Sequence, residues 1–363
     1  MRRYDVDWLR VYALGLLIVY HIVMSFQVFG KSFLFIQNQQ TLDELWPLMA
    51  MINVWRIPIL FMVSGMGVRF AMERRTWRQL LKDRTRRILI PLVFGHFCIV
   101  PIVTGLGLQY YGMSGGRFVW IPNPGHLWFL GNIFLYVVLC LPLFVFFKNR
   151  PDNRLVRLLA NACRSPIGLC LFIVPAVVET LLMGPELFEL FAGTPHGFFF
   201  GLVCFVTGFI FVSLKTVFWE AVERLRRGTL GLALVLYFVR LLVFELQAPN
   251  GLTAVESMSW MLGVLGYGSA YLNRPSHTLA YFSKAVYPVY IVHMPLQSLF
   301  AFYIIPLALP ALLKLALLLV LTFGASVTFY EVIKRLTWLR PLFGMIGKVK
   351  PNPIIPHQNQ VDS

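Results

Sequence analysis

The residues in this sequence that are best suited to chemistry lie near its start, in the stretch DWLRVYALGLLIVYH. Arg10 and His21 stand eleven positions apart in an apolar background, so a helix places them on one face, roughly 16 Å apart along its axis. An imidazole, with a pKa of about 6.5, can remove a proton from a hydroxyl and return it at neutral pH. We therefore expect His21 to be a general base, and we place Asp7 in the catalytic set because it pairs with Arg10 one turn away. A snorkelling arginine and a histidine that only bonds a neighbouring helix would leave the same pattern.

A second group of charged residues lies between positions 69 and 87, where eight of nineteen residues are Lys or Arg. Arg84 and Arg87 are one helical turn apart in RTRRILIP, and two guanidiniums on one face can hold phosphate oxygens bidentately. We expect Arg84, Arg86 and Arg87, together with Arg10, to bind a phosphate-rich donor at the cytoplasmic side. Attraction to anionic lipid head groups accounts for part of the same charge.

Further polar and aromatic residues lie inside apolar stretches, where they suggest a functional site. An aromatic belt at the membrane surface explains Trp128 without chemistry, and His293 is equally well explained as a structural hydrogen-bond partner. Glu179 is either interfacial or a partner of a basic site group, whereas Arg240 with Glu245 suggests a buried charge pair. The candidate substrate-binding residues are Arg56, Ser64, Trp128, Tyr290 and His293.

These residues need a scaffold, and the composition indicates its class. The chain has 363 residues, of which 58% are hydrophobic and 13% charged, against roughly 25% charged in soluble domains. Apolar stretches of about 20 residues, the length of a membrane span, recur along the chain. We predict an all-α polytopic membrane protein, in which residues 1–345 form one domain of about ten transmembrane helices and residues 346–363 a short disordered tail. The predicted spans are 9–29, 48–68, 88–109, 127–147, 166–183, 197–214, 229–247, 252–272, 285–305 and 309–330.

Two details of the predicted spans bear on their packing. Prolines fall inside three of them, at Pro101, Pro175 and Pro288, so neighbouring groups must supply partners for the backbone carbonyls that the prolines free. The small residues Ser64, Gly65 and Gly67 in the second span permit a close approach of another helix.

The distribution of charge gives the expected orientation. The chain carries 32 Lys and Arg against 16 Asp and Glu, a net charge of +16. When the basic residues are sorted by the loops between predicted spans, 27 of the 32 fall on one side. Cytoplasmic loops carry such an excess, so both termini are expected in the cytoplasm. Membrane topology thus explains the charge, and no nucleic-acid partner is expected.

The sequence resembles the acyltransferase-3 family of integral membrane acyltransferases from Asp7 to about residue 330. The resemblance rests on five stretches in the family's order and spacing, DWLRVYALGLLIVYH, RIPILFMVSG, RTRRILIP, GHLWFL and VYPVYIVHMP. Its most specific part is the arginine followed by histidine eleven residues later, joined to Arg-x-x-Arg after the second span. Within the family the sequence looks most like the branch of glucan biosynthesis protein C and the polysaccharide O-acetyltransferases.

The resemblance implies transfer of an acetyl or succinyl group from cytoplasmic acyl-CoA to a hydroxyl of an extracytoplasmic glycan, in the inner (plasma) membrane of a bacterium. Family positions map onto Arg10, His21, Arg84 and Arg87, whereas Arg56 falls at a position that varies among relatives. A thioester is activated enough that a positioned base and some oxyanion stabilisation suffice, so no metal is expected, and the five cysteines lack metal-ligand spacing. The implied partners are acyl-CoA, the glycan acceptor and the lipid bilayer, with a homo-oligomer or other glycan-synthesis proteins left open.

A different class of function fits part of the pattern. The intramembrane residues Arg240, His293, Glu179 and His21 are of the kind that line the path of an exporter for a small metabolite or lipid-linked sugar. No paired inverted segments are found in the sequence, however, and a scaffold for glycan synthesis would leave His21 without a role. Neither the acyl group nor the acceptor can be read from the sequence, nor whether His21 acts as a base in direct transfer or as a transient acyl carrier.

Overall fold

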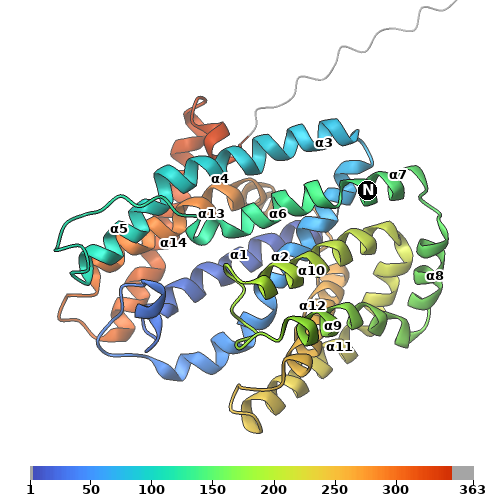
Figure 1. Cartoon of the computed structure of the whole chain (residues 1–363), viewed down its shortest axis with the longest axis horizontal. Helices are drawn as coiled ribbons and strands as arrows, with labels where there is room; N and C mark the ends of the chain where they lie inside the picture. The colour runs from blue at the N-terminus through green and yellow to red at the C-terminus, as the bar shows by residue number, and fades with distance from the viewer. Residues whose placement is uncertain (1–2, 346–363) are drawn as a thin grey trace, which may run out of the picture.

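The structure is a computed structural model that describes residues 3–345, and these form a bundle of helices without strands (Figure 1). Arg2 and the predicted tail, residues 346–363, lie outside the described residues. The α-helices are α1 Tyr4–Met24, α2 Trp46–Met72, α3 Trp77–Arg84, α4 Ile90–Phe94, α5 Val100–Tyr110, α6 Trp128–Leu139, α7 Leu141–Asn149, α8 Arg154–Cys163, α9 Val174–Met183, α10 Pro195–Ser213, α11 Thr216–Leu242, α12 Asn250–Leu272, α13 His277–Ile304 and α14 Ala311–Arg335. Short 3₁₀-helices are η1 Gly30–Phe33, η2 Asp43–Leu45, η5 Gly125–Leu127, η6 Pro166–Phe172 and η7 Arg340–Phe343, and the π-helical turns are η3 Thr85–Leu89 and η4 Gly95–Ile99.

Each of the ten predicted spans overlaps helical structure, and the all-α prediction is confirmed for the described residues. Among these residues, six helical segments are long and apolar enough to cross a membrane, or seven if α6 and α7, bent by 53°, count as one. The continuous rod of α3, η3, α4, η4 and α5 is one of the six. Helix α11 is not, because its first half carries several charged residues. Ten spans with cytoplasmic termini therefore stay a prediction.

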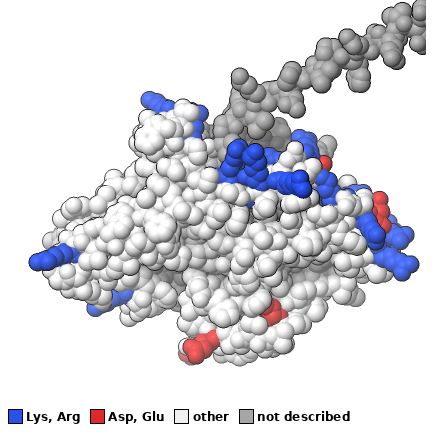
Figure 2. Space-filling view, turned by 45° about the horizontal axis from the view of Figure 1, so that its top comes forward, with Lys and Arg blue, Asp and Glu red and all other residues white. Residues whose placement is uncertain are grey.

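The loops that the charge count assigns to one side do meet at one end of the bundle. Lys148 in the last turn of α7 donates to the backbone carbonyl oxygen of Arg75 before α3, and Lys215 before α11 pairs with Asp152 before α8. Figure 2 shows many basic side chains along the upper and right-hand edges of the molecule and fewer at its left end, with a broad middle that carries little charge. We call this end of the bundle, where Arg75, Lys148 and Lys215 lie, the basic face.

Prolines inside the helices create attachment points for other segments. Because proline has no N–H, the carbonyl oxygen four residues earlier loses its usual helical partner. At three prolines a side chain from elsewhere in the chain donates to that oxygen, as a packed membrane bundle requires. The three sets are Pro58 with the Val54 oxygen and Ser257 (2.7 Å), Pro101 with the Phe97 oxygen and Trp120 Nε1 (3.0 Å), and Pro295 with the Ile291 oxygen and His126 Nε2 (3.1 Å).

Helices α2 and α10 pack backbone against backbone. A Cβ atom on Gly65 would lie 1.8 Å from the carbonyl oxygen of Phe205, and one on Gly208 would lie 1.9 Å from that of Met62. Only glycine fits at these two crossings, so the close approach predicted for the second span is found. The tight contact fixes α2, which carries several site residues.

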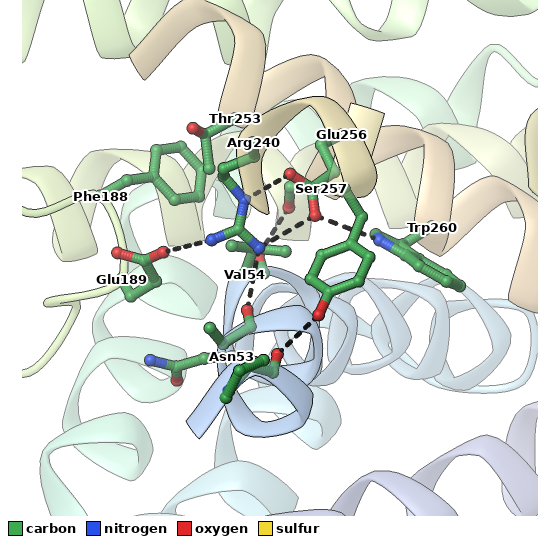
Figure 3. A network of polar contacts seen from close by, with 12 residues as sticks. Asn53, Val54, Phe188, Glu189, Arg240, Thr253, Glu256, Ser257 and Trp260 are labelled. Atoms are coloured by element: carbon green, nitrogen blue, oxygen red, sulfur yellow. Dashed lines mark hydrogen bonds and ion pairs between the residues drawn. The ribbon is translucent and has the colours of Figure 1, made fainter. Parts of the chain in front are cut away.

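Arg240 is completely buried where α11 meets α2 and α12 (Figure 3). Its guanidinium bonds both carboxylate oxygens of Glu256, at 2.6 and 3.1 Å, and it also reaches Glu189 at 3.2 Å and the Ala50 carbonyl oxygen at 3.0 Å. The predicted buried charge pair is thus confirmed, but its predicted partner, Glu245, is wrong because α11 ends before that residue. Burial raises the pKa of the Glu189 carboxyl, and Arg240 opposes that rise.

Replacing Arg240 alone with Met is expected to lower the free energy of unfolding by about 3–5 kcal/mol, since Glu256 is then left buried without its cation. The double variant Arg240→Met, Glu256→Leu should recover most of that loss, because the fully buried Glu256 carboxylate is gone and the remaining partner, Glu189, has a side chain that is 21% exposed to water. Thermal unfolding of the purified protein in detergent measures both. A double variant that is less stable than Arg240→Met would contradict this expectation.

Candidate active site

Helices α1 and α13 pack against each other, and each contributes a histidine at the contact (Figure 1). The Nδ1 of His21 is 3.0 Å from the Nε2 of His293, and the two rings are parallel to within 5°. His293 is completely buried, whereas His21 is partly exposed. Gln297, one turn further along α13, donates to the backbone carbonyl oxygen of His21 at 2.7 Å. We take this histidine pair as the candidate catalytic centre.

The hydrogen-bond partners of the pair decide which nitrogens carry protons. The Nδ1 of His293 faces the Tyr290 carbonyl oxygen at 2.6 Å, and because a carbonyl only accepts, this nitrogen donates. In neutral His293 the Nε2 is then an acceptor, so the Nδ1 of His21 donates to it. The Nε2 of His21 remains as an unprotonated nitrogen that bonds nothing in the described chain. A general base needs such a nitrogen.

A third histidine, His126, stands edge-on to His293 with the ring centroids 5.3 Å apart. Its Nε2 donates to the Ile291 oxygen that Pro295 frees, and its backbone carbonyl accepts from the Tyr290 hydroxyl. In the neutral ring the Nδ1 is therefore an acceptor, and this atom is buried without a partner. The chain before α6 is thereby fixed beside the histidine pair.

Arg56 lies near the histidine pair, ten residues after the first residue of α2 and about 15 Å along that helix. Its guanidinium lies 3.3 Å from the centroid of the Tyr20 ring and donates to Asn53 at 2.9 Å. The residue is 2% exposed, yet its Nε and Nη1 have no hydrogen-bond partner. It is within electrostatic range of His21. Unpaired N–H groups on a buried cation are costly, so this position suits an anionic or oxygen-rich ligand.

Arg10 and Arg84 meet at the backbone of α2. The Nη2 of Arg10 donates to the Val63 carbonyl oxygen at 3.2 Å, and that of Arg84 donates to the Gly67 carbonyl oxygen at 3.3 Å. A Cβ atom on Gly67 would lie 2.5 Å from the Arg10 guanidinium, so glycine makes room for the arginine. The Nε of Arg84 is buried and unpartnered. The guanidiniums of Arg10 and Arg84, both with N–H groups to spare, thus lie near the N-terminal end of α1. Arg10 precedes His21 by eleven residues, or roughly 16 Å along the helix.

The other two predicted phosphate ligands, Arg86 and Arg87, lie in different surroundings from Arg84. Arg87 is exposed and donates to Asp83 at 3.0 Å. Arg86 lines an open groove of about 520 Å³ that runs along α3 and η3. The π-helical turn Thr85–Leu89 separates Arg84 from Arg87, and its wider turn changes the direction of successive side chains, so a simple α-helical spacing does not apply.

Asp7 and the remaining candidates surround the pair less closely. Asp7 pairs with Arg10 at 3.3 Å, as predicted, and stands fourteen positions from His21. Ser64 donates to the Leu60 carbonyl oxygen within its own helix at 2.7 Å. Trp128 packs near the ring of Phe61, with centroids 6.0 Å apart.

Tyr290 is the residue whose carbonyl and hydroxyl connect His293 with His126. Glu179, left open by the sequence, pairs with His196 at 3.1 Å.

Two residues of the site were not predicted. His126 lies in the short 3₁₀-helix η5 before α6, outside any longer helix whose spacing could mark it. Tyr287 has a buried hydroxyl without a partner and lies within electrostatic range of Arg84 and Arg87. The spacing of Tyr287, Tyr290 and His293, three residues apart on α13, was a usable signal for one helix face that runs from the arginines to the histidines.

Comparison with known proteins gives the site its context. Residues 3–331 match the family model of the acyltransferase domain (Acyl_transf_3). The chain is 26% identical to the glucans biosynthesis protein C of Escherichia coli strain K12 and to that of strain SMS-3-5, over 99% of this chain and 97% of each relative. No solved structure matches the chain significantly.

Proposed function

The chain belongs to the acyltransferase-3 family, and from this premise we propose that it carries an acyl group from cytoplasmic acyl-CoA to a hydroxyl of an extracytoplasmic glycan. Its membership and its long apolar helices make it a multi-pass membrane acyltransferase. Three further points are proposals: the membrane is the inner membrane of a bacterium, the donor is a CoA thioester, and the acceptor is a glycan. The names of its relatives, which concern glucan biosynthesis, support a glucan as the acceptor.

The observation that carries the proposal is the free Nε2 of His21, oriented by His293. In the proposed reaction this nitrogen accepts the proton of the acceptor hydroxyl while the hydroxyl oxygen attacks the thioester carbonyl. The C–S bond then breaks, the acyl group stays on the acceptor oxygen, and the CoA sulfur receives a proton. The bond to His293 Nε2 keeps His21 in the required tautomer and stabilises the imidazolium that forms.

The donor is proposed to lie along α1. Its phosphates would sit at the basic face near Arg84, Arg86 and Arg87, and Arg10 would hold the next part of the molecule. The distance of roughly 16 Å from Arg10 to His21 would be covered by the pantetheine arm. The unpartnered hydroxyl of Tyr287 and Nε of Arg84 are available to its amide and phosphate oxygens.

The surroundings of Arg56 favour succinyl over acetyl as the acyl group. The two unpartnered nitrogens of Arg56 lie on a buried cation beside His21, where the free carboxylate of a succinyl thioester would supply the missing anion. An acetyl group offers no such anion, and Arg56 would then bind only uncharged oxygens.

Turnover of two donors by the purified protein tests the donor proposal. Release of the CoA thiol is measured with succinyl-CoA and with acetyl-CoA, in the presence of a glucan oligosaccharide. We expect Arg56→Gln to lower kcat/KM for succinyl-CoA by about 10- to 100-fold, because a charge-assisted hydrogen bond is lost, and to change that for acetyl-CoA little. Retained acetyl-CoA turnover shows that the variant is folded. An equal loss with both donors would contradict recognition of the carboxylate, and no glucan-dependent thiol release from the unsubstituted protein would contradict the transferase itself.

A further inference from the structure

The chain between α5 and α6 does not stay at the end of the bundle but turns back along the helix that it has just left (Figure 1). The ring of Phe118 lies against Gly105, the indole of Trp120 donates to the Phe97 carbonyl oxygen, and Leu127 lies against Gly95. These contacts lie on the rod from Trp77 to Tyr110, which is long and apolar enough to cross a membrane. The chain at Val119 and Asn123 runs beside Gly105 and Thr104, five and six residues or about 8–9 Å before the end of that rod, and Leu127 lies beside Gly95, about 22 Å before it.

The backbone of this returning chain is extended and unpaired. Residues 118–124 form no helix or strand, and residues 115–122 are all exposed. The backbone N–H groups of Phe118, Val119, Trp120, Ile121 and Asn123 donate to no group in the described chain. Irregular backbone at membrane depth occurs only where it is buried in protein or lines a water-filled space. Since this stretch is exposed, it must face water.

The returning chain is also held firmly. Besides the bond of Trp120 to the oxygen freed by Pro101, Asn123 donates to Thr104 at 2.8 Å, and His126 donates to the oxygen freed by Pro295. Trp120 and His126 are six residues apart, at most about 21 Å in extended chain. The exposed stretch therefore leads directly to the histidine pair.

We propose that residues 117–123 form one wall of a water-filled vestibule, open opposite the basic face, through which sugar rings of the acceptor reach His21. The exposed rings of Phe118 and Trp120, 6.1 Å apart, offer apolar surfaces on which the C–H faces of sugars stack. The unpaired backbone N–H groups donate to sugar hydroxyls, and Arg117 stands at the outer end. The acceptor part of this inference rests on the proposed function, whereas the water-filled vestibule does not.

Thiol labelling in intact cells tests the vestibule. The variants Val119→Cys and Ile121→Cys are made in a Cys98→Ser, Cys170→Ser background, which removes the two exposed native thiols. A matched control is Val320→Cys on α14, a position 70% exposed on an apolar helix that faces lipid. A membrane-impermeant thiol reagent added outside should label Val119→Cys and Ile121→Cys but leave Val320→Cys unmodified. Absence of labelling at both positions, or labelling only in inside-out vesicles, would overturn the vestibule whether or not the protein proves to be a transferase.

Acceptor kinetics test the stacking surface. With a glucan oligosaccharide as the probe, Trp120→Ala should raise the KM for the glucan about ten-fold and leave the KM for acyl-CoA unchanged, while Trp120→Phe, which keeps a ring, should lie between. The control is Trp338→Ala, because Trp338 is 73% exposed in the chain after α14. An unchanged glucan KM in Trp120→Ala, or an equal rise in the control, would overturn the role of Trp120.

Discussion

The variant His21→Ala is expected to lose acyl transfer by about 10²- to 10⁴-fold while remaining folded. The reason is the position of one atom: the Nε2 of His21 is the unprotonated nitrogen that the bond to His293 leaves available. Alanine keeps the helix, since α1 needs no polar group at this position, but offers no base. The rate of glucan-dependent CoA release under saturating donor and acceptor measures the loss.

The matched control for that loss is His277→Ala, which removes an exposed histidine at the start of α13, away from the pair. It should leave the rate unchanged. Acyl-CoA binding by His21→Ala should also stay near that of the unsubstituted protein, because the proposed donor ligands are arginines near the basic face. Transfer at the normal rate by a folded His21→Ala protein would remove the general-base role.

Replacement of His293 is expected to give the second-largest effect, a fall in kcat of about 100-fold in His293→Ala. Without an acceptor opposite its Nδ1, His21 is free to hold its proton on either nitrogen, and the imidazolium formed during transfer loses its partner. His293→Gln should retain more activity, because its amide oxygen can accept from the Nδ1 of His21. Steady-state kinetics of the three proteins separate kcat from KM.

A positioning role for His293 predicts a loss in kcat with little change in the KM of either substrate, together with partial rescue by glutamine. If His293 instead contacts the substrate, as the sequence suggested, both variants should raise a KM, and glutamine should be no better than alanine. A loss that follows reduced thermal stability equally in both variants would also contradict the positioning role.

The part of the site that lies on one helix could be predicted from the sequence. Arg10 and His21 share a face of α1 because their spacing is close to three helical turns, and Asp7 pairs with Arg10 for the same reason. The partnership of His21 with His293 could not be predicted, since 272 positions separate them and no local pattern links α1 to α13. Both residues were candidates, but as base and substrate ligand rather than as a hydrogen-bonded pair.

Other features escaped prediction because they depend on departures from regular helix. The spacing of Arg84 and Arg87 assumes an α-helix, whereas a π-helical turn begins between them. His126 reaches the site only because the chain after α5 turns back and because Pro295 frees an oxygen for it. Prolines within apolar stretches did predict that freed carbonyls need partners, but not which segment would supply them.

Two of the residues that the sequence offered for an exporter, Arg240 and Glu179, are already paired in the structure. Arg240, which the sequence offered as part of a transport path, is closed into an ion pair with Glu256 and Glu189 (Figure 3). Glu179 is likewise occupied by His196. Unused hydrogen-bonding capacity near α1 is found instead on Arg84, Arg56 and His126, among other described groups such as Tyr287 and Gln297, and this suits a bound donor and acceptor better than a continuous path of exchangeable charges.

Transfer across a sealed membrane tests the central claim most directly. The protein is reconstituted into vesicles that enclose a glucan oligosaccharide, and acyl-CoA with a radiolabelled acyl group is supplied outside, where molecules with an outward basic face can bind it. The account predicts that label accumulates on the enclosed glucan with the unsubstituted protein and not with His21→Ala. Label that reaches only glucan on the same side as the acyl-CoA, or that reaches the enclosed glucan equally in His21→Ala, would contradict it.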